Sequence, residues 1–195
     1  MSYPLTIRFK ILAIARQISV EDATGQLLLY VKQKAFKLKE AVTVFADREQ
    51  TRPLYEINAD RVIDFNAAYR ITDMQGAELG SIRQQGMRSI WRARFDIVRN
   101  DQVLFQISEE NPWTKMADSF LGEIPVIGLL SGYLLHPRYL ITAAGGNPVI
   151  QIEKQPAFLE GVFRFERLGT PLSPDDERLV LLSSLMMVLL ERRRG

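Results

Sequence analysis

Residues 173–190, SPDDERLVLLSSLMMVLL, decide the fold of this 195-residue chain. Ser173 is placed as the N-cap of a helix and Pro174 at its first position. From residue 179 to residue 190 every side chain except two serines is apolar, so the helix has no polar face and must be surrounded by protein or lipid. A helix of that length measures about 18 Å, against roughly 30 Å for a bilayer core. The sequence therefore predicts no transmembrane segment, and a helix enclosed by β structure.

The composition is that of one globular domain, which we expect to span residues 1–195. Hydrophobic residues make up 47% and charged residues 25% of the chain, as in ordinary folded proteins. Because there is no cysteine, disulfides, thiolate nucleophiles and cysteine-ligated metals are excluded. A net charge of +2 argues against a nucleic-acid partner. The first ten residues do not have the pattern of a signal peptide, so we expect a cytoplasmic location.

Three turn-like segments share one spacing, which indicates a repeat. They are DATG at 22–25, DMQG at 73–76 and AAGG at 143–146, and apolar residues follow each final glycine by three and six positions. Asp at the first turn position and Gly at the fourth favour a hairpin. We therefore predict two β units, residues 18–58 and 69–109, and a more degenerate third unit, residues 139–168. A chance match of so few positions is the alternative.

Between the second and third units the character of the sequence changes. Residues 112–121 have the spacing of a short amphipathic helix. Residues 123–135 are apolar but are interrupted by one proline and two glycines, which suits neither a long helix nor a central strand. This segment can be a plug over one barrel end, a loop that dips into a membrane, or a partner-binding surface. Its candidate apolar contact residues are Ile124, Val126, Ile127, Leu129, Leu130, Leu134 and Leu135.

Basic side chains gather in corresponding parts of the first two units. The candidate residues for a face that binds anionic lipid are Lys32, Lys34, Lys37, Lys39, Arg88, Arg92 and Arg94. Strand alternation would place Arg92 and Arg94 on one outer face. An anionic membrane attracts such side chains by about 1 kcal/mol each. The alternative is a solvated strand face whose charge is balanced by nearby acids.

Groups that could carry catalysis are sparse. The single histidine, His136, lies in a predicted loop, and the chain has no Gly-x-Ser-x-Gly motif around a nucleophilic serine. The neighbouring acids 109–110 and 175–176 are not selected as an acid–base pair, and no Asp-x-Asp-x-Asp run indicates calcium. We predict no catalytic residue, no metal site and no cofactor.

Several of these stretches together resemble a known family. They are VEDATGQ (20–26), VKQKAF (31–36), QGMRSIW (85–91), ENPW (110–113), GEIP (122–125) and the final helix. The chain resembles the tubby-like C-terminal superfamily, most nearly its LURP-one-related and phospholipid scramblase-like proteins, and more narrowly uncharacterised bacterial members. The resemblance implies a closed antiparallel barrel of about twelve strands around the hydrophobic C-terminal helix. Tubby proteins bind phosphoinositides through basic side chains, which the resemblance does not match residue by residue here.

Together these observations predict a mainly β protein that is not an enzyme. The expected function is a β-barrel module that interacts with anionic phospholipid or a membrane-associated partner, so that it would lie at the membrane periphery. The alternative is a hydrophobic-ligand carrier or an enzyme that uses a pocket at a barrel end.

Overall fold

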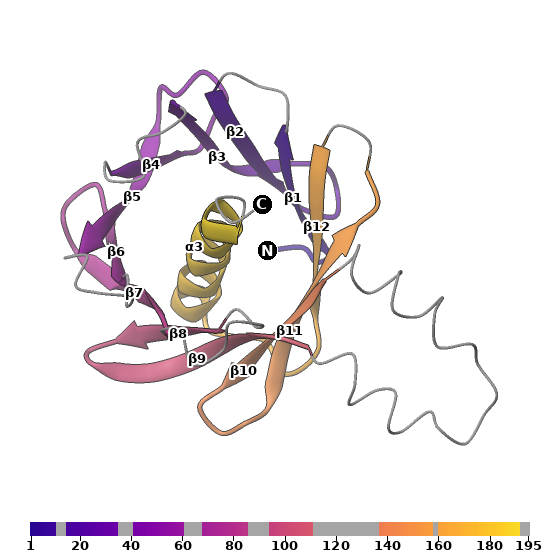
Figure 1. Cartoon of the computed structure of the whole chain (residues 1–195). Coiled ribbons are helices and arrows are strands. Elements are labelled where there is room, and N and C mark those ends of the chain that lie inside the picture. The colour runs from indigo at the N-terminus through magenta and orange to yellow at the C-terminus, as the bar shows by residue number, and fades with distance from the viewer. Residues whose placement is uncertain are drawn as a thin grey trace.

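The computed structural model describes residues 1–10, 15–34, 41–60, 68–85, 94–110, 137–157 and 160–191. Within these residues twelve antiparallel strands close into one barrel, and helix α3 lies inside it (Figure 1). The predicted fold class is therefore confirmed. The strands are β1 (Leu5–Lys10), β2 (Ala15–Glu21), β3 (Leu27–Lys34), β4 (Val42–Phe45), β5 (Pro53–Asp60), β6 (Ala68–Asp73), β7 (Glu78–Gln84), β8 (Arg94–Arg99), β9 (Gln102–Glu109), β10 (Arg138–Ala143), β11 (Pro148–Gln155) and β12 (Glu160–Arg167), and the helix is α3 (Pro174–Glu191).

Every strand pairs with its neighbour in sequence, and the barrel is closed where β1 lies between β2 and β12. Side chains alternate along the strands, as the pleat requires. In β1, Leu5 and Ile7 are fully buried, whereas Arg8 and Lys10 are exposed on the outer wall. The apolar members of the other strands join those of β1 in a single core cluster.

The predicted turns are confirmed, and the structure adds a second sign of the repeat. Gly25, Gly76 and Gly146 have φ values of 81°, 86° and 82°, and they close the hairpins β2–β3, β6–β7 and β10–β11. A register shift precedes each glycine by the same number of residues, after Val20, Ile71 and Ile141. A shared bulge at a shared position is a feature of related units rather than of chance.

Helix α3 begins as predicted. The Ser173 hydroxyl accepts a hydrogen bond from the Asp176 N–H at 3.2 Å and donates one to the Asp176 carboxylate at 2.8 Å. Arg99 of β8 donates to the same carboxylate at 2.7 Å, which fixes the start of the helix to the wall. Residues 179–190 are all buried and contribute ten apolar side chains to the core. The helix therefore occupies the barrel interior that a ligand would otherwise enter.

The helix lies very close to β7 at Gly80. A Cβ atom there would lie 2.5 Å from the Val98 carbonyl oxygen and 3.0 Å from the Leu179 side chain, and the backbone has a φ of 149°. Only glycine meets both conditions without strain.

A cluster of polar groups lies at the same end of the barrel. Glu177 in the first turn of α3 is buried and pairs with Arg167 and with the amino group of Met1. The Arg167 guanidinium lies 4.4 Å from the centre of the Tyr3 ring. Burial, followed by the negative charge of Glu177, raises the pKa of the Tyr3 hydroxyl to about 12.

Candidate functional site

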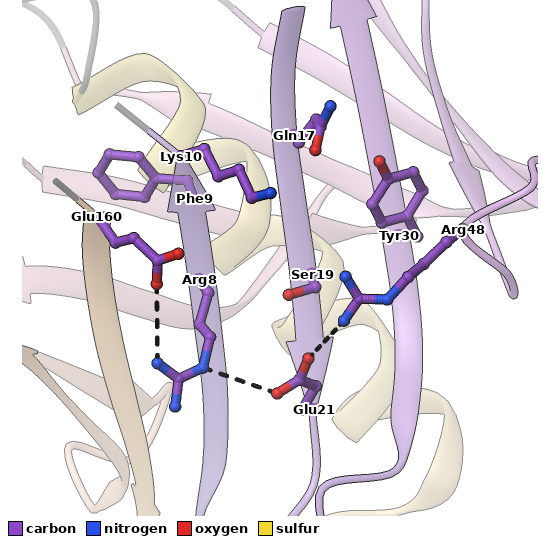
Figure 2. A pocket seen from close by; sticks show the side chains of 9 residues that line it. All are labelled: Arg8, Phe9, Lys10, Gln17, Ser19, Glu21, Tyr30, Arg48 and Glu160. Atoms are coloured by element: carbon purple, nitrogen blue, oxygen red, sulfur yellow. Dashed lines mark hydrogen bonds and ion pairs between the residues drawn. The ribbon is translucent and has the colours of Figure 1, made fainter. Parts of the chain in front are cut away.

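A small pocket, lined mainly by polar and charged residues, lies on the outer wall of the barrel, where β12, β1, β2 and β3 run side by side (Figure 2). Its volume is about 230 Å³. It is lined by Arg8, Phe9, Lys10, Gln17, Ser19, Glu21, Tyr30, Arg48 and Glu160. We call this set the wall pocket.

Strand register brings these residues together. Arg8 lies opposite Ser19, and Ser19 lies opposite Tyr30, so the three form a row across β1, β2 and β3. In the neighbouring row Lys10 lies opposite Glu160 of β12. Arg48 reaches the pocket from the connection between β4 and β5. The wall pocket therefore combines residues from both ends of the chain.

Four side chains of the wall pocket form a chain of alternating charge (Figure 2). Glu21 lies between two guanidinium groups, at 2.9 Å from Arg48 and 3.7 Å from Arg8. On its other side Arg8 reaches the Glu160 carboxylate only at 3.9 Å. Because these side chains are partly exposed, each pair contributes at most about 1 kcal/mol to stability. Glu21 thus compensates much of the positive charge of the two arginines.

Other polar groups of the wall pocket are left available. In Figure 2 no hydrogen bond or ion pair joins Lys10, Gln17, Ser19 or Tyr30 to another drawn side chain. Ser19 and Tyr30 are only 8% and 6% exposed, so their positions are fixed by packing. An ammonium, an amide and two hydroxyls can together donate hydrogen bonds to an oxyanion.

The residues predicted from sequence for a lipid-binding face are only partly described. Lys32 is exposed on β3 and Arg94 is exposed on β8, and strands β4 to β7 separate them in the barrel. They therefore do not lie on one continuous patch. Lys32 lies opposite Gln17, at the border of the wall pocket. Lys34 lies in β3, with only its backbone described, and Lys37, Lys39, Arg88 and Arg92 lie outside the described residues.

The predicted apolar contact segment, residues 124–135, and His136 also lie outside the described residues. The acidic pair 175–176 is explained by the start of α3, where both residues form ion pairs with arginine. In the part of the chain that the structure describes, no group of three or more His, Asp or Glu side chains is arranged to hold a metal ion. No helix among these residues has the length and hydropathy needed to cross a membrane.

The wall pocket itself was not predicted from the sequence. The one available signal is the alternation in β1, which places Arg8 and Lys10 on the polar side of a half-buried strand. The two ion-pair partners of Arg8, Glu21 and Glu160, could be assigned only once the register of β1 against both neighbours was known.

A closed antiparallel barrel of twelve strands around an apolar C-terminal helix defines the tubby-like class of proteins. Within that class, the sequence model of the LURP-one-related family matches residues 27–164, more than half of the chain, so the protein belongs to the LURP-one-related family. The resemblance to the LURP-one-related proteins noted in the sequence is thereby confirmed.

A search of solved structures finds a similar chain in the crystal structure of an Arabidopsis thaliana protein. The two sequences are 14% identical, the match covers 98% of this chain and 92% of the other, and the TM-score is 0.48. Comparison with curated proteins gives no match.

Proposed function

We propose that this protein is a non-enzymatic barrel module that binds anionic phospholipid through its outer wall. The observation that carries the proposal is the position of α3. The buried residues of the helix occupy the barrel axis, where a hydrophobic ligand would otherwise lie, and the polar groups of the wall pocket lie on the outside. A carrier or an enzyme with a pocket at a barrel end is not favoured by this arrangement.

Positive charge on one part of the outer wall supports a lipid ligand. Lys10 and Arg8 project from β1, Lys32 from β3, and Arg48 from the connection that follows β4. Set against the two carboxylates of the wall pocket, Glu21 and Glu160, these four cations leave an excess of two positive charges. At about 1 kcal/mol for each charge near an anionic surface, the excess gives roughly 2 kcal/mol, or about thirtyfold in binding. Membrane binding is therefore expected to be weak, reversible and sensitive to salt.

The test is sedimentation with vesicles of phosphatidylcholine alone or mixed with phosphatidylserine. We expect recovery with the anionic vesicles only, and a decline of the bound fraction as salt is raised. Lys32→Gln is expected to weaken binding about fivefold, the effect of one lost charge. Arg94→Gln on β8 removes the same charge from the far side of the barrel, so it serves as the matched control.

Equal recovery with both kinds of vesicle would refute the proposal. Binding to native membranes that is lost after protease treatment of those membranes would instead identify a membrane-associated protein as the partner. Whether the partner is an anionic lipid or a membrane-associated protein, the proposal assigns the protein to the cytoplasm, at the membrane periphery.

A further inference from the structure

Two side chains of opposite charge in the wall pocket, Glu160 and Lys10, make the weakest contacts with its other charged groups. The Glu160 carboxylate makes its pocket ion pair at 3.9 Å, close to the limit for such a contact, and its side chain is 39% exposed. Lys10 lies opposite Glu160 in the register, yet its ammonium extends away from Glu160 toward β2 (Figure 2). The pocket therefore presents one available cation and one available anion at separate places.

From this arrangement we infer that the wall pocket binds an aminophosphate group, in which a primary ammonium and a phosphate are joined by a short carbon chain. The phosphate lies at Lys10 and the nearby Ser19 and Tyr30 hydroxyls, which donate hydrogen bonds to its oxygens. The ammonium lies at the carboxylate of Glu160. The inference extends the proposed function by naming the headgroup. Its application to a membrane lipid, as opposed to a free molecule, rests on that proposed function.

The mixed charge explains why a simple phosphate is a poorer ligand. Arg8 and Arg48 already share Glu21, so a phosphate alone would gain Lys10 while it lies close to two carboxylates. An ammonium on the same ligand turns the Glu160 carboxylate from a repulsive neighbour into a partner.

The size of the wall pocket agrees with a headgroup and not with an acyl chain. Its volume of about 230 Å³ corresponds to roughly seven or eight water molecules in the liquid. Pockets for drug-sized ligands start at about 300 Å³. The aminophosphate has two sources, the headgroup of phosphatidylserine or phosphatidylethanolamine and a free molecule such as O-phosphoethanolamine.

The first arm of the test is calorimetry on the full chain with two free probes that differ only in the ammonium, O-phosphoethanolamine and ethyl phosphate. We expect the first to bind about tenfold more tightly. Glu160→Gln should remove this preference, and Lys10→Gln should weaken both probes. The control for Glu160→Gln is Glu166→Gln, which makes the same change on the same strand at a carboxylate paired with Arg164. The control for Lys10→Gln is Lys154→Gln, which removes a lysine from β11. Both control variants should bind the two probes as the wild type does.

The second arm compares vesicles with equal fractions of phosphatidylserine or phosphatidylglycerol. The two lipids carry the same net charge, but only phosphatidylserine has an ammonium, whose charge is balanced by a carboxylate. Preference for phosphatidylserine that Glu160→Gln abolishes supports the inference for a lipid source. Binding of free O-phosphoethanolamine without any vesicle binding supports the site with a soluble ligand, and the proposed membrane function then fails alone. Equal binding to the two lipids together with equal binding of the two free probes overturns the inference, while the proposed function stands.

Discussion

Replacing Ser183 by alanine should make the protein more stable, although it removes a polar group from a helix. Ser183 and Ser184 are adjacent in α3, and both are 0% exposed. The Ser184 hydroxyl donates a hydrogen bond to the Val180 carbonyl at 2.8 Å. The Ser183 hydroxyl has no hydrogen-bond partner among the described residues. The two serines thus form a matched pair that differs in one hydrogen bond.

The expected size of the effect follows from this difference. A buried hydroxyl without a partner costs about 1–3 kcal/mol, and alanine gains about 0.5 kcal/mol over serine in helix propensity. Ser183→Ala should therefore raise the free energy of unfolding by about 2 kcal/mol. In Ser184→Ala the same gain in propensity is offset by the lost hydrogen bond, worth about 1 kcal/mol net, so that variant should change little.

The assay is urea unfolding followed by far-UV circular dichroism, with the slope m compared among the three proteins to check that the transition stays comparable. For a chain of this length, 2 kcal/mol corresponds to a rise in Tm of roughly 4–8 °C. If Ser183→Ala were less stable than wild type, or if both variants changed by the same amount, the hydroxyl would have a partner and the reasoning would be wrong.

Two further predictions concern the closeness of α3 to the wall and the cluster at its first turn. Gly80→Ala should lower the free energy of unfolding by about 3 kcal/mol, because its Cβ would lie 2.5 Å from a backbone oxygen at a positive φ. Gly145→Ala, whose Cβ meets only the Asn147 side chain at 4.0 Å, should change stability by less than about 0.5 kcal/mol in the same melts. Since burial and Glu177 raise the pKa of Tyr3 from 10.0 to about 12, the folded state keeps its proton where the unfolded state loses it, and stability should fall as pH rises from 10 to 12. Tyr3→Phe should reduce that fall, measured as urea midpoints against pH; an identical pH dependence in both proteins would show that Tyr3 is not responsible.

Much of the fold was predictable because its signals are local. The N-cap at Ser173 and the apolar run that follows it fix the helix and its burial within eighteen residues. The hairpin turns at Gly25, Gly76 and Gly146 are likewise read from four-residue segments. In each case the deciding interactions are hydrogen bonds or burial patterns between residues close in sequence.

The candidate site was not predictable for the opposite reason. Arg8 meets Glu160 and Glu21 only through the pairing of β1 with both of its neighbours, and such register is set by the whole closed sheet. The predicted basic face shows the same limit. Lys32 and Arg94 belong to successive units, and units that follow one another around a closed barrel turn their side chains to different sides.

The position of the wall pocket also links any ligand to the integrity of the barrel. The first two units supply four strands each, β2 to β5 and β6 to β9, while the third supplies β10 to β12 and takes its fourth strand, β1, from the start of the chain. The wall pocket lies over that closing strand, with Glu160 on one side and Glu21 on the other. A ligand that binds there binds only the closed barrel, and at a hundredfold excess over its Kd it would stabilise that state by about 2.7 kcal/mol. The strands β1 and β12 are far apart in the sequence, so among the strand pairs their pairing has the greatest cost in loop-closure entropy. A ligand of the wall pocket would stabilise that pairing.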